Sequence, residues 1–218
     1  MKRIMTLAIV LLGIVAFSVP ANALTIELNY EFSGAYSPQS PQPPSWLKAD
    51  FVQTGAGEVT LTMTAQNLTG AEFIGVWDFN LNPAKNPEAL AIDYVSGVTG
   101  AVSAKADNFK ADGDGYFDIS FNFAANAFTD GLTSVYTFTL AGLTVADFNY
   151  SSVSGGGAGT YKSAAHVQGI DKPDVPGVDS AGSGWIGPGD GMMVPEPGTI
   201  ILLGLGLLGL GIVVRKRS

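Results

Sequence analysis

The sequence contains no cysteine and only one histidine. The absence of cysteine excludes disulfide bonds, thiolate nucleophiles and thiolate metal sites. A single histidine cannot build a multi-histidine metal site. The chain must therefore be stabilised by a packed core, and a region of about 150 residues is long enough to form one.

Basic residues are also scarce, with eleven lysines and arginines against nineteen acidic residues. Five of the eleven lie near the two ends of the chain. Residues 24–198 hold six lysines, no arginine and all nineteen acids, which gives this region a net charge of −13. Such a surface repels nucleic acid and other anionic polymers unless divalent cations bridge the two. We therefore expect no nucleic-acid partner.

The N-terminus has the layout of a secretory signal peptide. A basic Met1-Lys2-Arg3 segment precedes an apolar stretch at residues 4–17, and a small-x-small site follows at Ala21-Asn22-Ala23. This layout predicts that residues 1–23 direct the chain to the export translocon and are removed by cleavage after Ala23.

Residues 24–170 consist of short alternating apolar and polar runs separated by turn residues, and no segment keeps a 3.6-residue apolar period. In residues 58–65, Val59, Leu61 and Met63 are expected to share one buried face. The spacing of the turns is typical of sandwiches. We predict a single antiparallel β-sandwich of eight to ten strands, with a jelly-roll-like topology.

Residues 116–123 give the sharpest prediction of which side chains are buried. Phe117, Ile119, Phe121 and Phe123 are expected to face the core, and the polar residues between them are expected to face water. Residues 171–194 are rich in glycine and proline and poor in apolar side chains, so we interpret them as a linker.

The C-terminal region, residues 195–218, has three parts. Pro195-Glu196-Pro197 is followed by an apolar run at residues 199–214 and then by Arg215-Lys216-Arg217. The basic cluster predicts retention on the cytoplasmic side of a membrane. The apolar run would form a short transmembrane helix of about 24 Å, less than the roughly 30 Å of a hydrocarbon core.

These three parts, together with Val194, resemble a PEP-CTERM sorting signal of the kind found on exported proteins of Gram-negative bacteria that make extracellular polysaccharide. The resemblance implies recognition by exosortase, an integral-membrane processing enzyme, and removal of the tail near residues 195–197. It further implies transient anchoring in the inner membrane before delivery to the cell surface or extracellular matrix. Residues 204–209 also fit the bare GxGxxG pattern, but no strand precedes them, so no dinucleotide site is expected.

Alternating aspartate and glycine at residues 112–118 suggest two alternatives. Asp112, Asp114 and Asp118 could offer carboxylate oxygens to calcium from a tightly turning backbone. The segment departs from the EF-hand pattern, because Phe117 stands where that pattern has glycine. The same residues fit a tight β-turn that leads into the next strand.

The sequence contains no recognisable motif of catalytic residues. His166 has no G-x-S-x-G partner motif, and no carboxylate pair stands out for glycoside hydrolysis. Trp46 and Trp185 could stack on sugar rings, whereas Trp77 is expected in the core. We interpret the protein as a non-enzymatic surface or matrix protein associated with extracellular polysaccharide or biofilm. The alternatives are a calcium-assisted carbohydrate-binding module and a polysaccharide-acting enzyme.

Overall fold

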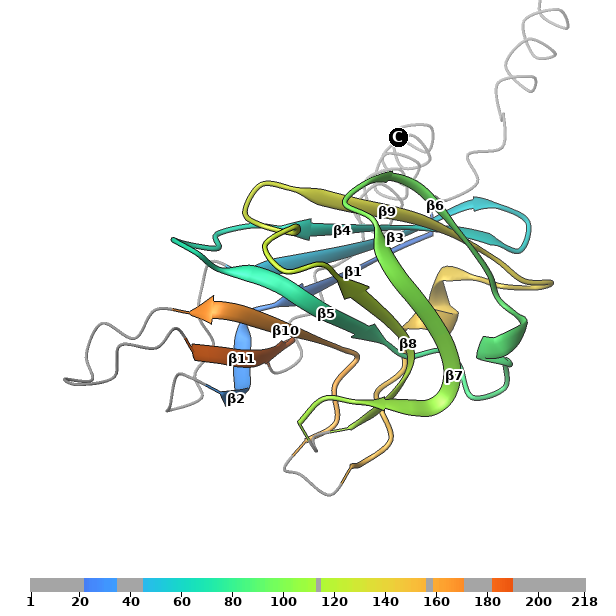
Figure 1. Ribbon diagram of the computed structural model, residues 1–218. Coiled ribbons are helices and arrows are strands. Elements are labelled where there is room, and N and C mark those ends of the chain that lie inside the picture. Colours follow the sequence, from blue (N-terminus) through green and yellow to red (C-terminus); the bar gives the residue numbers. More distant parts are fainter. Residues whose placement is uncertain (1–21, 35–44, 113–114, 156–158, 171–181, 190–218) are drawn as a thin grey trace, which may run out of the picture. The chain divides into compact units, whose positions relative to one another are not determined.

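The computed structural model describes residues 22–34, 45–112, 115–155, 159–170 and 182–189 (Figure 1). Within these ranges the chain forms eleven strands and two short 3-10 helices, so the all-β prediction is confirmed and the predicted maximum of ten strands is one too low. The strands are β1 (Ala23–Leu28), β2 (Tyr30–Gly34), β3 (Leu47–Gly55), β4 (Glu58–Ala65), β5 (Phe73–Phe79), β6 (Ala91–Gly97), β7 (Gly100–Lys110), β8 (Tyr116–Phe123), β9 (Thr133–Thr139), β10 (Ser163–Ile170) and β11 (Gly182–Gly187). The 3-10 helices are η1 (Pro87–Ala89) and η2 (Val145–Phe148).

The strands form two antiparallel sheets. Sheet A has the order β1-β3-β4-β9-β6, and sheet B has the order β2-β11-β10-β5-β8-β7. Only β3–β4, β7–β8 and β10–β11 are hairpins within one sheet, and every other connection between consecutive strands passes from one sheet to the other. The jelly-roll description stays a prediction.

The two sheets share one hydrophobic core. Val59, Leu61 and Met63 on β4 are fully buried, as the alternation predicts, because a strand turns successive side chains to opposite faces. Phe51 of sheet A meets Phe79 of sheet B edge to face, with ring centroids 5.5 Å apart. Residues Ala23–Glu196 form one compact unit. A fragment spanning residues 22–196 therefore holds the whole described core and is expected to fold on its own.

The prediction that the polar residues of β8 face water is wrong for two of them. Asp118 and Ser120 are buried, because Asp118 accepts the backbone amides of Leu81 and Asp107 and Ser120 lies beside buried Asp78. A second hydrophobic cluster consists of Phe32, Ala111, Phe117 and Ala164. Phe117 is buried as predicted, but it belongs to this second cluster and not to the main core.

The linker prediction is wrong for residues 182–187. They form β11, which pairs with β10 on one side and β2 on the other, so sheet B extends beyond residue 170. Sequence reasoning missed this strand because it is rich in glycine and carries only two large apolar side chains, Trp185 and Ile186. The other residues of the predicted linker, 171–181 and 190–194, lie outside the described residues.

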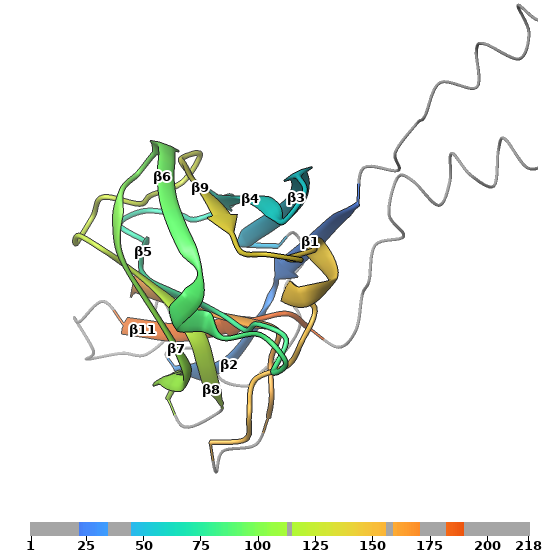
Figure 2. The ribbon, with the colours of Figure 1, turned by 90° about the vertical axis from the view of Figure 1, so that its right-hand side faces the viewer.

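The two lateral sides of the molecule differ. On one side β1 ends at Leu28 and β2 begins at Tyr30, so the chain passes from sheet A to sheet B across Asn29 alone. The Asn29 backbone N–H donates to the Gly187 carbonyl at 3.1 Å. On the other side the edges are β6 in sheet A and β7 in sheet B (Figure 2).

Candidate functional site

Most of the predicted processing residues lie outside the described residues. These are Pro195, Glu196, Pro197, Arg215, Lys216, Arg217 and Ala21. Ala23 is described and begins β1, where it pairs with Val52. Cleavage after Ala23 would therefore leave β1 starting at Leu24. No helix among the described residues is long and apolar enough to cross a membrane, and the predicted C-terminal span falls outside them.

The predicted calcium residues are used differently from one another. Asp112 accepts a hydrogen bond from the Ser33 hydroxyl. Asp118 accepts the Leu81 amide on Oδ2 and the Asp107 amide on Oδ1, both at 2.8 Å, so each of its oxygens already has a backbone partner. Burial raises the pKa of Asp118, although these two amides oppose the shift.

Asp114 lies outside the described residues, and within the described ranges no group of three or more potential metal ligands comes together. Calcium binding at this turn stays a prediction.

The three tryptophans have different environments. Trp77 is fully buried, as predicted, and its indole N–H donates to the Ser163 hydroxyl at 2.9 Å. Trp46 is partly buried against the main core. Trp185 is half-buried on β11, where its neighbour Ile186 faces the core and Trp185 faces the outside of sheet B.

Strand register aligns Trp185 with five other side chains in a line across the outer face of sheet B. The partners in consecutive strands are Ser33, Trp185, His166, Val76, Asn122 and Ala101. We call this set the outer-face row. All six residues are exposed or half-buried. Six strands at about 4.8 Å spacing make the row roughly 24 Å long, the length of several sugar rings.

An aromatic pair stands near one end of the outer-face row. The His166 and Trp185 rings are stacked with centroids 5.0 Å apart and an interplanar angle of 23°. The Gln168 amide nitrogen lies 3.4 Å from His166 Nδ1. Glycine at position 75 leaves room for the Gln168 amide, because a Cβ there would require the end of the Gln168 side chain to move.

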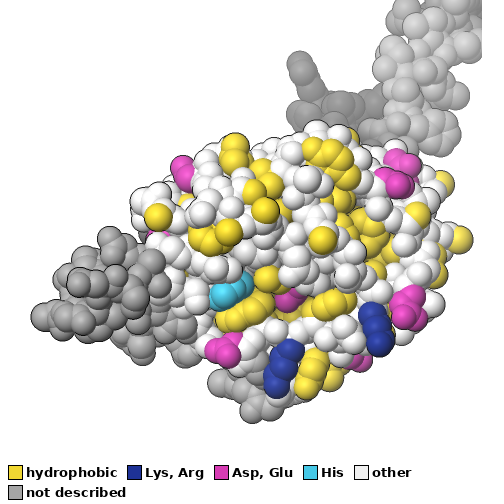
Figure 3. All heavy atoms as spheres, viewed as in Figure 1, with side chains coloured by type: hydrophobic (Ala, Val, Ile, Leu, Met, Phe, Trp, Pro, Cys, Tyr) yellow, Lys and Arg dark blue, Asp and Glu magenta, His cyan; other side chains and the backbone are white. Residues whose placement is uncertain are grey.

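The charge on His166 is set by its surroundings. Burial lowers the pKa of His166, and the nearby carboxylate of Asp112 partly offsets this. The imidazole is therefore neutral at neutral pH and offers one donor and one acceptor nitrogen. In Figure 3 the single histidine, coloured cyan, lies on the surface beside hydrophobic side chains.

A buried carboxyl lies beside the outer-face row. Asp78 pairs across the sheet with Ala164 and Ser120, and all three are buried. Its Oδ1 has no hydrogen-bond partner among the residues that the structure describes. Burial raises the pKa of Asp78 to about 7, against an opposing hydrogen bond with Ser120. Asp78 is 1% exposed, so it cannot reach a substrate in this conformation.

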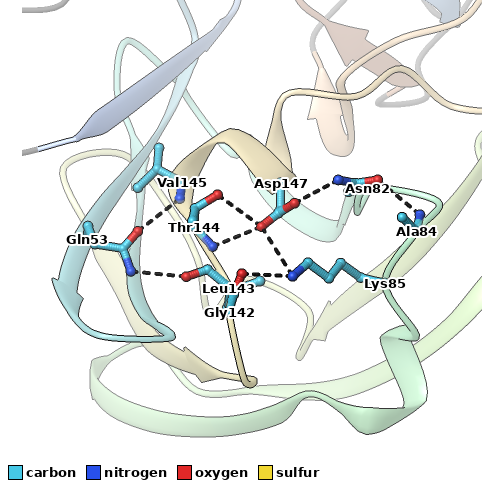
Figure 4. Close-up of polar contacts among 9 residues, drawn as sticks. All are labelled: Gln53, Asn82, Ala84, Lys85, Gly142, Leu143, Thr144, Val145 and Asp147. Atoms are coloured by element: carbon cyan, nitrogen blue, oxygen red, sulfur yellow. Dashed lines mark hydrogen bonds and ion pairs between the residues drawn. The ribbon is translucent and has the colours of Figure 1, made fainter.

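A polar network at η2 is structural (Figure 4). Asp147 accepts hydrogen bonds from Asn82 Nδ2 at 2.8 Å and from the Thr144 amide at 2.9 Å, and Lys85 Nζ lies 3.9 Å away. Burial by itself raises the pKa of Asp147, but the hydrogen bonds from Asn82 and Thr144 and the charge of Lys85 lower it overall. The network joins η2 to the segment after β5.

The same network reaches sheet A through Gln53. This side chain donates to the Leu143 carbonyl at 3.2 Å and accepts the Val145 amide at 3.1 Å. Because the Asp147 and Gln53 side chains are engaged within the protein, we assign this cluster to fold stability and not to ligand binding.

Comparison with known proteins identifies the C-terminal segment. Residues 194–217 match the PEP-CTERM protein-sorting motif, which confirms the predicted sorting signal. The motif implies a protein that is exported and sorted by exosortase. It covers a small share of the chain and leaves the two-sheet region unassigned. No curated protein and no solved structure matches the chain.

Sequence reasoning missed most of the outer-face row. Trp185 was a candidate for sugar stacking, but His166 was considered as a catalytic residue, and Val76 and Asn122 carried no signal. The row joins residues between 33 and 185 in the chain, and no local pattern predicts that register. Gly75, which sits where the β5–β10 register shifts, was the one sequence feature that could have suggested a crowded surface there.

Proposed function

We propose that this protein is a non-enzymatic surface or matrix protein that binds extracellular polysaccharide through the outer-face row. Two independent observations support the proposal. The PEP-CTERM motif implies export and sorting, which supports a role outside the cell. The stacked Trp185–His166 pair is the single observation that carries the binding role.

The chemistry of the row suits a sugar chain. The apolar face of a sugar ring packs on aromatic side chains, while its hydroxyls exchange hydrogen bonds with neutral polar groups. Trp185 and His166 offer the aromatic surface. Gln168 and Asn122 offer amide donors and acceptors on the same outer face. A polymer lying along the row could contact several strands at once.

The charge of the protein restricts the polymer. Residues 24–198 carry a net charge of −13, and Asp112 lies close to the aromatic pair. An anionic polymer would be repelled by these charges. We therefore propose that the ligand is a neutral or amino-bearing polysaccharide.

Binding to polymers of three charge types tests this proposal. Affinity electrophoresis of residues 22–196 through gels containing dextran, chitosan or alginate measures retardation by a neutral, a cationic and an anionic polymer. We expect retardation by dextran or chitosan but not by alginate. Trp185→Ala should weaken binding by about tenfold, because it removes the aromatic anchor.

Tyr150→Ala is the matched control, since Tyr150 is an exposed aromatic outside the row. The melting temperature of each variant checks that folding is retained. Equal retardation of wild type and Trp185→Ala, with both folded, would refute the assignment of binding to this row. Retardation by alginate alone would refute the charge argument.

A calcium-assisted mode is the second candidate, favoured by the position of Asp112. This residue contacts Ser33 of the row and influences His166, so a cation held at Asp112 would lie beside the proposed binding surface. Calorimetric titration of calcium into wild type and Asp114→Ala tests it. Heat of binding in wild type that is lost in the variant supports this mode, and no heat in either protein refutes it.

A further inference from the structure

A second surface lies on the side of the molecule away from the β1–β2 passage, between the edges of the two sheets. β6 pairs only with β9, and β7 pairs only with β8. Within the described part of the chain, no strand therefore pairs with the outer edge of either one. Figure 2 views this side of the protein. An unpaired edge presents a row of backbone N–H and C=O groups to which another chain can bind.

An open groove of about 460 Å³ lies beside these two edges. Its lining residues are Pro87, Glu88, Leu90, Ile92, Val102 and Ala104. Ile92 pairs with Phe138 and Ala104 pairs with Ile119, and both partners belong to the main core. Leu90, Ile92, Val102 and Ala104 pack against this core from its margin, so the groove lies at the edge of the core, and its volume falls in the range of ordinary ligand sites.

The strands that border the groove are held in place. Pro87 and Glu88 of η1 line it, and η1 contacts β7. Tyr136 on β9 holds Gly100, the first residue of β7. Its hydroxyl accepts a hydrogen bond from the Gly100 amide at 2.7 Å and donates one to the Gly100 carbonyl at 3.1 Å, which fixes the start of β7 against β9. The groove is thus a preformed feature of the fold.

We propose that this groove docks an extended segment of a partner protein in which apolar and basic residues alternate, and that the segment adds to β6 as a new strand of sheet A. Alternate side chains of a strand point to the same face. Every second side chain of the added strand would therefore enter the groove beside Leu90 and Ile92, while the backbone pairs with β6. The seven residues of β6 would give about three such side chains.

The charges around the groove determine which charge the partner segment should carry. Its lining holds one acid, Glu88, and no base, and Asp93 lies on the exposed face of β6. A second copy of this protein would bring the same Glu88 and Asp93 and a net charge of −13 over residues 24–198. Like charges disfavour that pairing, so a basic segment from a different protein fits better. The exposed apolar residues Tyr94 and Val95 on β6 extend the contact surface.

Fluorescence anisotropy with a synthetic peptide tests the proposal on residues 22–196. The probe is fluorescein-labelled Lys-Val-Lys-Val-Lys-Val-Lys, and the comparison peptide has glutamate in place of lysine. We expect binding of the basic peptide only. Glu88→Lys should weaken it about fivefold by reversing the charge at the groove. Ala104→Phe should weaken it about tenfold by filling the groove.

Glu27→Lys is the control for charge, because it makes the same change on β1, at the opposite side of the sandwich. It should bind the peptide nearly as wild type does. Hydrogen–deuterium exchange gives an independent readout, since strand addition should slow exchange of the β6 amides by about tenfold or more.

Three outcomes would overturn the proposal. The first is that Glu27→Lys and Glu88→Lys weaken peptide binding equally, which would show that binding depends only on the overall charge of the protein. The second is unchanged β6 exchange at saturating peptide. The third is sedimentation of the free protein as a dimer that Ala104→Phe converts to monomer, which would assign the groove to a second copy. Because dextran and chitosan are absent, these results are independent of polysaccharide binding.

Discussion

Replacing Asp78 by asparagine tests the buried carboxyl on the outer side of sheet B. Asp78 is 1% exposed and its Oδ1 lacks a partner within the described residues. Burial raises its pKa from 3.8 to about 7, with Ser120 opposing the shift. The native state therefore holds this proton more tightly than the unfolded chain does. The resulting stabilisation is complete below pH 3.8 and is lost as the pH rises to about 7.

The size of the effect follows from the shift. One pKa unit corresponds to about 1.4 kcal/mol, so a shift of roughly three units predicts that this group alone lowers the free energy of unfolding by about 4 kcal/mol between acid and neutral pH. Asparagine cannot ionise, so Asp78→Asn should lose this dependence. Its absolute stability could fall by about 1–3 kcal/mol if the new amide lacks partners. The dependence on pH is therefore the quantity to compare.

Urea unfolding of residues 22–196 followed by tryptophan fluorescence at a series of pH values from 5 to 8 provides the measurement. Wild type should lose stability across this range, and Asp78→Asn should lose clearly less. Asp93→Asn is the control, because it makes the same change on the exposed strand β6. Parallel curves for wild type and Asp78→Asn would show that the Asp78 carboxyl is hydrated in solution, and the reasoning from burial would be refuted.

Two further predictions concern the network at η2 and the last residue of β6. Asp147→Ala should lower the free energy of unfolding by about 2–4 kcal/mol at pH 7, because it leaves the Asn82 and Thr144 donors unpaired. The pKa of Asp147 is lowered, so its carboxylate stabilises the fold above the ordinary pKa of 3.8, and this stabilisation is lost as the pH falls below that value. The melting temperatures of Asp147→Ala and wild type should therefore converge in acid. Gly97→Ala should cost about 2–3 kcal/mol in denaturant unfolding, because φ is +86° and a Cβ would collide with the Thr133 carbonyl. Gly70→Ala, with φ of +59° but open space, should cost only about 1 kcal/mol, and equal losses would contradict the steric argument.

The sequence was sufficient for the parts of the fold that follow from local alternation. Val59, Leu61 and Met63 are buried as their spacing predicts, and so are Ile119 and Phe121. Side-chain direction in a strand has a period of two, so a polar and apolar alternation reports directly on one buried face. Trp77 was also placed correctly in the core.

Local alternation failed where distant segments meet the polar side of a strand. Asp118 and Ser120 have the spacing of solvated residues, yet they are buried, because Asp118 accepts the amides of Leu81 and Asp107 and Ser120 lies beside Asp78. These neighbours lie on or next to strands β5 and β7, away from β8 in the chain. Their meeting depends on strand order, and strand order depends on contacts between distant segments.

The sequence by itself determined the route of this protein and its class of structure. The sorting motif at residues 194–217 is a contiguous signal that can be recognised without a fold, and the alternating strands define an all-β protein. Only the tertiary structure decided that residues 182–187 complete sheet B, that Trp185 stands against His166, and that a groove lies beside the edge strands β6 and β7. Each of these depends on register between segments far apart in the chain, which hydrogen bonding and core packing fix only when all the strands are assembled.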